Sequence, residues 1–343
     1  MHVLYNESLQ TRNTLALSAV ASAFVSVASE GELIEALGWG KEQKKSIVVL
    51  GQGSNIVLAG DLDALVIQQA GRGIEVIEDN EQDVTLKVAA GENWHTLVEW
   101  TLDRGYFGLE NLALIPGTVG AAPIQNIGAY GVELAAFVSR VHGIWIDTCQ
   151  PLALTGAECK FAYRDSIFKR GLRDKVVITS LELILSRTAK PQTGYPGLKA
   201  ELDDKQFADI TPRAVFDAVV SIRRAKLPDP AAIPNAGSFF KNPVLTQPDA
   251  DELLARAPEL PCYPQADGRV KIPAAWLIEK CGWKGRRVGK VGVHPEHALV
   301  LVNYEKDSEE DGSRLLALAG DIANSVFADY GVTLEIEPRV YGQ

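Results

Sequence analysis

The sequence predicts an α+β fold, because strand-like and helix-like segments follow each other without the strict alternation of a βαβ fold. Apolar or alternating runs bounded by Gly, Asp or Asn predict strands at residues 46–50, 64–68, 84–90, 138–147 and 176–186. One clear helix interrupts them at 94–104, where Asn93 is the expected N-cap and Gly105 ends the apolar pattern. The first part of the chain is therefore sheet-rich.

The character of the chain changes near residue 211. Thr211 followed by Pro212 is an N-cap with proline at the first helical position, and it predicts a helix to about residue 226. The remaining elements that we predict are helices at 249–257, 274–281 and 312–330 and strands at 299–303 and 332–341. We therefore expect residues 213–330 to form a separate α+β domain.

Composition excludes several classes of protein. The chain has 343 residues, 46% of them apolar, and a net charge of −10 with no long Lys/Arg cluster, so we expect no nucleic-acid surface. Its four cysteines lack metal-ligand spacing, and His294 and His297 have no third ligand at a recognisable spacing, so we expect no metal site. Without a signal core or a long apolar run, the chain is predicted to be cytoplasmic, with no membrane contact.

Two uncharged, glycine-rich segments are the most informative features. Residues 115–131 hold four glycines, which leave backbone N–H groups free to face an anion. Upstream, the apolar run 46–50 leads into Gly51-Gln52-Gly53-Ser54-Asn55-Ile56, and such a strand followed by a turn suits phosphate binding. It is not a dinucleotide fingerprint, since Ile56 stands where the third glycine would be. A plain hairpin is the alternative for one segment, but two together favour a bound cofactor.

Three further positions could carry chemistry. Ser238 lies among small and polar residues that leave its hydroxyl accessible, and the alternative is a loop serine with a local turn bond. No Gly-x-Ser-x-Gly elbow surrounds it, which argues against a serine hydrolase. Arg164 is either a buried fork for a carboxylate or part of a surface region with stacked rings. Glu335 and Glu337 share one face of the expected closing strand, where a solvated face is the alternative.

Five motifs occur in order, with matching spacing, over nearly the whole chain. They are Gly51-Gln52-Gly53-Ser54-Asn55, Ile115-Pro116-Gly117-Thr118-Val119-Gly120, Asn126-Ile127-Gly128-Ala129-Tyr130-Gly131, Tyr163-Arg164-Asp165-Ser166 and Asn235-Ala236-Gly237-Ser238-Phe239-Phe240-Lys241-Asn242-Pro243. With them the chain resembles the UDP-N-acetylenolpyruvoylglucosamine reductase family. The resemblance implies a two-part FAD-binding domain of the vanillyl-alcohol-oxidase/PCMH type, at 1–70 and 71–212, to which 331–343 returns. Residues 213–330 would form the UDP-sugar substrate domain.

The resemblance also implies a set of site residues. FAD would lie against Gly51, Gly53, Ser54, Asn55, Pro116, Gly117, Thr118, Gly120, Ala121 and Gly128. The family's proton donor, arginine and glutamate fall on Ser238, Arg164 and Glu337. Glu335 remains the competitor for the glutamate, because Pro338 follows where the family usually has valine. The substrate-binding residues would be Tyr130, Tyr195, Lys226, Asn242 and Arg339, of which Tyr195 belongs to the tyrosine loop of one family branch.

The implied chemistry has two halves that share one pocket. NADPH gives a hydride to flavin N5, and the hydride then passes to C3 of the enolpyruvyl ether of UDP-N-acetylglucosamine, while Ser238 protonates C2. The product would be UDP-N-acetylmuramate, a peptidoglycan precursor, and the partner is this small molecule. One alternative is an FAD-dependent oxidase of an alcohol or hydroxy acid, although none of the five histidines adjoins either glycine-rich segment as a flavin attachment site. A nucleotide-sugar binding module without redox chemistry is the other.

Overall fold

A computed structural model describes residues 1–204, 210–265, 267–307 and 309–342. The described chain forms two compact units: Met1–Glu7, Ala21–Gln52 and Asp63–Ala225 make the first, and Ser8–Val20, Gly53–Leu62 and Lys226–Gln343 make the second. Both units contain helices and strands, so the α+β prediction is confirmed. The division into domains at residues 70, 212 and 330 stays a prediction.

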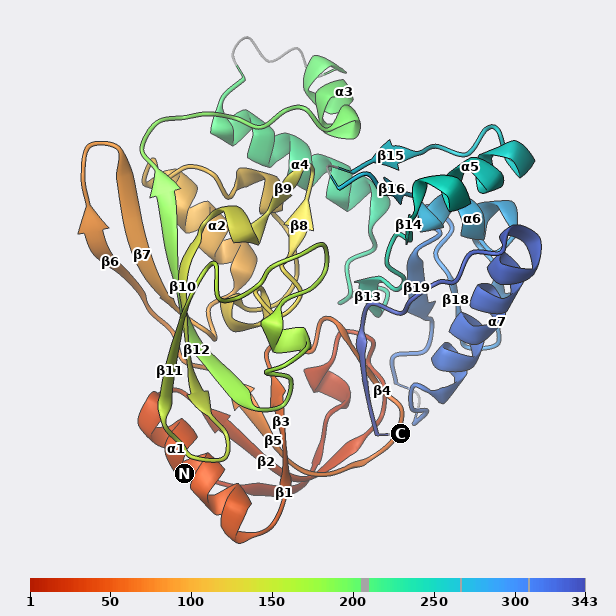
Figure 1. Cartoon of the computed structure of the whole chain (residues 1–343). Coiled ribbons are helices and arrows are strands. Elements are labelled where there is room, and N and C mark those ends of the chain that lie inside the picture. Colours follow the sequence, from red (N-terminus) through yellow and green to blue (C-terminus); the bar gives the residue numbers. More distant parts are fainter. Residues whose placement is uncertain (205–209, 266, 308, 343) are drawn as a thin grey trace. The chain divides into compact units, whose positions relative to one another are not determined.

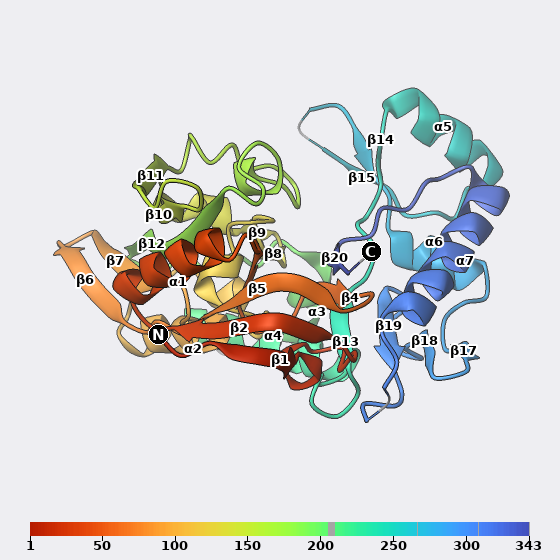
Figure 2. The same cartoon turned by 90° about the horizontal axis from the view of Figure 1, so that it is seen from below.

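The first sheet of the first unit has four strands, visible with the helix that covers it in Figure 2. Their order is β1 (Leu4–Ser8), β2 (Val20–Val27), β5 (Leu62–Gln69) and β3 (Ser46–Leu50). The helix is α1 (Glu30–Glu42), whose buried Leu33, Ala36 and Leu37 pack against apolar residues of β2 and β5. Strand β3 pairs in parallel with β5, and it delivers the chain into the first glycine-rich segment.

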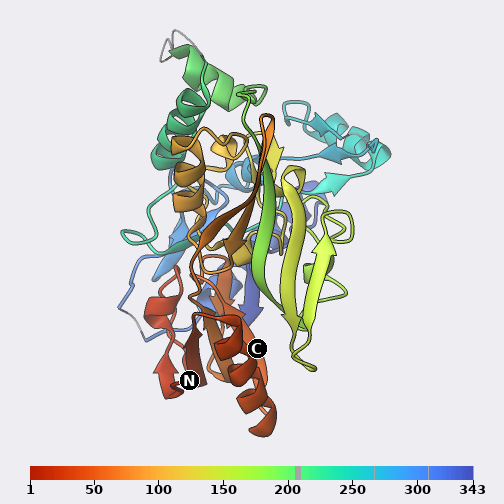
Figure 3. The same ribbon diagram turned by 90° about the vertical axis from the view of Figure 1, so that its left-hand side faces the viewer.

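The second sheet of the first unit has five strands in an antiparallel arrangement, seen from its side in Figure 3. Their order is β11 (Pro151–Thr155), β10 (Val138–Trp145), β12 (Val176–Ser186), β7 (Asp83–Ala89) and β6 (Ile74–Asp79). Its buried face forms one core with helices α2 (Trp94–Asp103) and α4 (Pro212–Lys226). This unit also contains the paired strands β8 (Gly128–Ala129) and β9 (Val132–Glu133), the helix α3 (Pro196–Asp204) and short 3-10 helices at Glu110–Leu112, Val119–Ala121, Leu134–Ala136 and Ile167–Lys169.

The helix signals of the sequence work as local chemistry predicts. The Asn93 side chain accepts the hydrogen bond of Thr96 N at 2.9 Å, and Thr211 Oγ1 accepts that of Ala214 N at 3.1 Å. Val215 and Val219 are fully buried in the core of the first unit. Burying each such side chain contributes about 1.5–3 kcal/mol. The helix that we predicted as the start of the C-terminal domain therefore packs with the first unit.

The second unit contains three small sheets, three α-helices and a 3-10 helix at Gln10–Arg12 among the described residues (Figure 1). The largest sheet has the order β13 (Asn235–Ser238), β19 (Val300–Asn303), β18 (Val291–Val293) and β17 (Arg287–Val288). The second has the order β14 (Val244–Leu245), β16 (Val270–Lys271) and β15 (Tyr263–Pro264), and the third pairs β20 (Arg339–Tyr341) with β4 (Ile56–Leu58). The helices are α5 (Gln247–Arg256), α6 (Ala274–Lys280) and α7 (Ser313–Tyr330).

The predicted closing strand at 332–341 is wrong in extent. Only β20 is a strand, and it pairs in parallel with β4, whereas the preceding residues join Phe240 through an isolated bridge at Ile336. By contrast, the apolar stripe of α7 is confirmed as core, since Leu315, Ile322 and Val326 are fully buried. Within the described residues, no helix combines the length and the apolar character that a membrane span requires.

Candidate functional site

The first glycine-rich segment, residues 51–55, follows β3 and turns its carbonyl groups toward the protein. Gly51 O accepts from Gln68 Nε2 at 3.5 Å, and Gly53 O accepts from Thr14 N at 3.0 Å. Because the C=O and N–H of one trans peptide unit point in opposite directions, the N–H groups of Gln52 and Ser54 point away from these partners. This orientation suits the pyrophosphate of FAD, which the family resemblance implies.

Gly53 is required by the backbone in this segment. Its φ is +63°, and a Cβ at this position would lie 2.2 Å from Arg12 O and 2.8 Å from Asn13 Cα. Both atoms belong to the backbone, so they cannot move aside like a flexible side chain. Asn55 O, two residues later, accepts from Arg339 N at 3.0 Å, which fixes the end of the segment on β20.

The second glycine-rich segment corrects one sequence-based expectation. Its N–H groups are not free for an anion, because the chain itself uses them as donors: those of Val119, Gly120 and Ala121 bond to Glu92 O, Ala90 O and Thr118 O. Gly120 is a glycine because a Cβ there would lie 2.6 Å from Ala90 Cβ. This segment, which also contains exposed Pro116 and buried Gly117 and Thr118, therefore offers a tightly packed main-chain surface, suited to a flat ring rather than to phosphate.

Gln52 connects the two segments, and the sequence analysis missed it. Its Oε1 accepts from Gly117 N at 3.2 Å and from Asn93 Nδ2 at 3.4 Å, while the missing Cβ of Gly51 leaves room for Thr118. The glycine-rich motif contains Gln52, but nothing in the sequence indicated that the side chain of this residue would bond to the second segment. Gly51 and the second segment therefore lie side by side in the first unit. A cofactor site formed by both segments requires this proximity.

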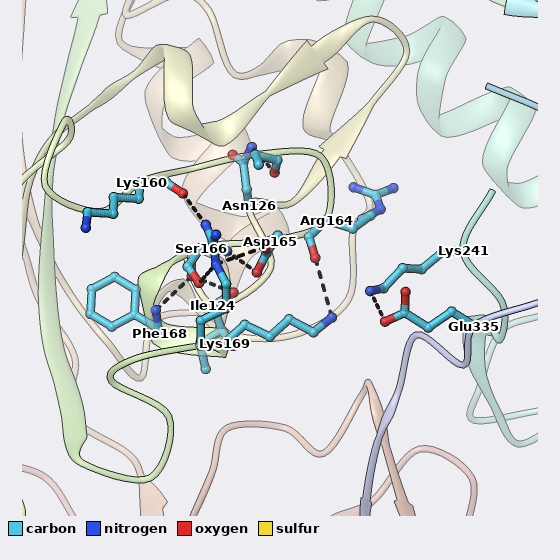
Figure 4. A network of polar contacts seen from close by, with 12 residues as sticks. Ile124, Asn126, Lys160, Arg164, Asp165, Ser166, Phe168, Lys169, Lys241 and Glu335 are labelled. Carbon is cyan, nitrogen blue, oxygen red and sulfur yellow. Dashed lines mark hydrogen bonds and ion pairs between the residues drawn. The ribbon is translucent and has the colours of Figure 1, made fainter. Parts of the chain in front are cut away.

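Arg164 lies at the tip of a tight turn that several side chains hold in place (Figure 4). Ala162 and Asp165 exchange two backbone hydrogen bonds of 3.0 and 3.1 Å across the turn, and Arg164 has a φ of +52°. Ser166, which is fully buried, donates to Ile124 O at 2.7 Å, and Lys169 Nζ donates to Arg164 O at 3.4 Å. A left-handed backbone at a non-glycine residue costs about 1–3 kcal/mol and is common at functional sites.

The Arg164 guanidinium extends away from Ser166 (Figure 4) and donates to Gly128 O at 2.9 Å. A Cβ on Gly128 would lie 3.4 Å from the Arg164 Nη1 atom and only 3.0 Å from Glu133 Cγ and Val132 O, so the glycine permits this close approach. The structure therefore places the predicted arginine against the second glycine-rich segment. The guanidinium also lies 5.6 Å from the centroid of the Tyr163 ring, and the role of Arg164 in binding a carboxylate stays a prediction.

Tyr130 and Tyr195 meet edge to face in the same unit, with ring centroids 5.4 Å apart. Burial raises the pKa of the Tyr130 hydroxyl above its ordinary value, while the positive charge of Arg223 acts in the opposite direction. Arg223 Nε also donates to Leu114 O at 3.3 Å. Burial is the main cause that lowers the pKa of Arg223, and the positive charge of Arg164 acts in the same direction. Such an arrangement favours an anionic ligand.

Ser238 and Glu337 belong to the second unit, where neighbouring segments carry them. Ser238 ends β13, directly after Gly237, whose φ is +70°. Glu337 N donates to Phe239 O at 2.9 Å, and Lys241 N donates to Glu335 O at 2.9 Å. This register places Glu337 beside the residue that follows Ser238. The Glu335 side chain instead forms an ion pair with Lys241 and is 69% exposed (Figure 4). The choice of Glu337 rather than Glu335 as the catalytic glutamate stays a prediction.

The remaining candidate residues of the second unit have different settings. Arg339 begins β20, bonds through its N–H to Asn55 O and stacks its guanidinium on Tyr341 at 4.5 Å from the ring centroid. Asn242 Oδ1 accepts from Ala274 N at 2.9 Å, at the start of α6. Lys226 is exposed at the end of α4. Within this unit, the structure brings Arg339 to the first glycine-rich segment.

Comparison with known proteins gives consistent matches. Residues 229–341 match the model of the UDP-N-acetylenolpyruvoylglucosamine reductase C-terminal domain, and residues 21–146 match that of an FAD binding domain. A UDP-N-acetylenolpyruvoylglucosamine reductase of Pseudomonas putida is 44% identical over 334 residues, covering 97% of each chain. Another, of Burkholderia multivorans, is 49% identical over 293 residues, covering 85% of this chain and 83% of the other. The crystal structure of UDP-N-acetylenolpyruvylglucosamine reductase from Thermus caldophilus, 23% identical, covers 99% of this chain and 98% of that one with a TM-score of 0.67.

Proposed function

Because the chain belongs to the UDP-N-acetylenolpyruvoylglucosamine reductase family, we propose that it reduces the enolpyruvyl ether of UDP-N-acetylglucosamine to UDP-N-acetylmuramate, with NADPH as the reductant. It is an FAD-dependent oxidoreductase of peptidoglycan-precursor synthesis. The predicted fold class is confirmed as well, since an FAD-binding domain precedes the family's C-terminal domain. The cytoplasmic location that the sequence favours stays a prediction.

The two glycine-rich segments hold FAD in this proposal. When bound, FAD would supply hydride transfer, from NADPH to its N5 position and from there to C3 of the enolpyruvyl group. Gly51, Gly53, Ser54 and Asn55 bind the pyrophosphate, for which the outward N–H groups of residues 52 and 54 are suited. The packed surface of the second segment supports the flavin, through Pro116, Gly117, Thr118, Gly120, Ala121 and Gly128.

Arg164 stabilises the charge that develops when the hydride reaches C3. Negative charge then appears at C2 and on the adjacent carboxylate, and a guanidinium can meet both carboxylate oxygens with parallel N–H donors. The turn around Arg164 holds its backbone before substrate binds, so little reorganisation is needed. A fixed donor of this kind contributes about 3 kcal/mol, by analogy with an oxyanion hole.

Ser238 donates its hydroxyl proton to C2, and Glu337 orients this donor. A hydroxyl with a high pKa can protonate only a strongly basic carbon, which the developing charge at C2 provides. In support of this choice, Glu335 is engaged in an ion pair with Lys241, and the Glu337 backbone is bonded to Phe239, the residue next to Ser238 in the chain. Without the Arg164 guanidinium, the negatively charged state at C2 would be too high in free energy to form, and Ser238 would have no basic carbon to protonate.

The UDP part of the substrate is recognised by a second group of residues. Tyr195 closes over the nucleotide, and Tyr130 lies near the sugar, consistent with their edge-to-face contact. Lys226, Asn242 and Arg339 contact uridine or diphosphate; the two cations compensate the diphosphate charge in a chain whose net charge is −10.

The observation that best supports this function is the Arg164 turn, which holds a guanidinium on the carbonyl of Gly128. Rapid mixing of a Ser238→Ala variant tests the proposed reaction. NADPH should still reduce the flavin at the normal rate, while reoxidation by the enolpyruvyl substrate should slow by about 100-fold or more. Ser313→Ala, at an exposed serine of the same unit, is the matched control. Equal losses in both half-reactions would show that Ser238 has a structural role only.

A further inference from the structure

Asn111 is a fully buried polar residue that joins two distant parts of the first unit. Its side-chain Nδ2 donates to Tyr130 O at 3.0 Å and to Gln192 O at 2.8 Å. These acceptors lie 19 and 81 residues away along the chain. A carboxamide nitrogen carries two N–H groups, and here each has a different backbone carbonyl as its acceptor.

Each of the two carbonyls belongs to a segment that carries a tyrosine. Tyr130 is itself one acceptor, and Gln192 begins the segment 192–198 that contains Tyr195. The Tyr130 ring also meets the Tyr195 ring edge to face, with centroids 5.4 Å apart. Tyr195 is 47% exposed, and its position depends on the backbone that Asn111 holds and on the start of α3 directly after it.

We propose that Asn111 is a positioning residue that fixes these two tyrosine-bearing segments as one recognition surface for the UDP-sugar, an inference that rests on the function proposed above. Asn111 itself contacts no ligand and acts through Tyr195 and Tyr130. With the two backbone segments joined, the tyrosine rings keep their edge-to-face arrangement before the substrate arrives. The substrate therefore does not have to order the 192–198 segment when it binds.

The bonding of Asn111 argues against a role in packing alone. Its Oδ1 atom is buried and accepts no hydrogen bond from any described residue. A buried acceptor without a donor is unfavourable, so an apolar side chain would fill this space at a lower cost. The two donors of Nδ2 are what an apolar residue could not supply, and both are used to join the tyrosine-bearing segments.

The first test compares Asn111→Ala with Asn303→Ala. Asn303 is also buried and donates from Nδ2 to a distant carbonyl, that of Leu15, at 3.0 Å, but it belongs to the second unit. If the ordered arrangement is populated one-tenth as often in Asn111→Ala, the KM for the enolpyruvyl substrate should rise about tenfold. Its kcat and its rate of flavin reduction should stay near wild type. An unchanged KM, or the same rise in Asn303→Ala, would overturn the proposal.

A second measurement follows the backbone directly and does not depend on turnover. Amide hydrogen exchange in peptides that cover 190–198 should become faster in Asn111→Ala than in the wild-type protein. If the alanine variant does not fold, Asn111→Ser takes its place, because serine retains one hydrogen-bond donor. Its KM and its exchange rate should then lie between those of the wild-type protein and those expected for complete loss of both hydrogen bonds. Unchanged exchange in 190–198 would show that Asn111 does not order this segment.

A double-mutant cycle with Tyr195→Ala separates action through the tyrosine from a general effect. In the Tyr195→Ala background, Asn111→Ala should change KM by less than about twofold, because the group it positions has been removed. Independent, multiplicative effects of the two changes would contradict the proposal. If the wild-type protein did not turn over the enolpyruvyl substrate at all, the proposed function would fail, whereas normal wild-type turnover with no effect of Asn111 would remove this inference alone.

Discussion

Replacing Gly53 by alanine tests whether the first glycine-rich segment holds its shape for the cofactor. At a φ of +63°, an alanine loses about 1–2 kcal/mol in backbone energy. Its Cβ would also lie 2.2 Å from Arg12 O, and this carbonyl cannot rotate away. Overpacking of this kind costs a further 1–3 kcal/mol or so. We therefore expect a total loss of about 2–5 kcal/mol in the free energy of unfolding.

The matched control is Gly282→Ala in the same unit. Gly282 has a φ of +75°, but a Cβ there would meet nothing within 4 Å, so only the backbone cost of about 1–2 kcal/mol applies. Denaturant unfolding of both apoproteins measures the stabilities, and titration with FAD measures affinity. Gly53→Ala should weaken FAD binding at least about tenfold, or about 1.4 kcal/mol, while Gly282→Ala should not. Equal stability losses with unchanged FAD affinity in both variants would refute the reasoning.

Three further predictions concern the reaction and its pH dependence. Arg164→Lys should slow flavin reoxidation by the enolpyruvyl substrate about 100-fold, but not reduction by NADPH, because an ammonium lacks the planar fork; near-normal turnover would remove Arg164 from the site. Glu337→Gln should cause a similar selective loss in stopped-flow traces, while Glu335→Gln should lose only an exposed ion pair of under about 1 kcal/mol; the opposite result would exchange their roles. Burial lowers the pKa of His95, so as the pH falls the unfolded chain takes up a proton on this residue before the folded chain does, and the stability of the fold should decrease below about pH 6.5. His95→Asn should flatten this part of a profile of melting temperature against pH, and an unchanged slope would contradict this prediction.

The elements with strong local signals could be predicted from the sequence. Strands 46–50 and 176–186 have the predicted bounds, and α2 begins after its predicted cap, because alternation and capping are properties of neighbouring residues. Helix α1 was missed, since three glycines weaken its helical signal. Its stability comes from the burial of Leu33, Ala36 and Leu37 against the sheet, and no local pattern reveals this packing.

The candidate site could be located from the sequence but not built. Glycine content identified both segments, yet it could not show that the N–H groups of 119–121 are already used by the chain. The pairing of β20 with β4, which brings Arg339 to Asn55, joins residues more than two hundred positions apart. Gln52 and Asn111 were missed for the same reason, because the importance of each depends on carbonyl and N–H partners that only the folded chain supplies.

Absorbance spectroscopy under anaerobic conditions tests the central claim most directly. The purified protein should show the spectrum of oxidised flavin, and NADPH should bleach it. Addition of UDP-N-acetylglucosamine enolpyruvate should then restore the oxidised spectrum with one equivalent of UDP-N-acetylmuramate formed. A protein that binds no flavin would contradict the account, as would a reduced flavin that the enolpyruvyl substrate leaves bleached and that reoxidises, with release of peroxide, only after oxygen is admitted.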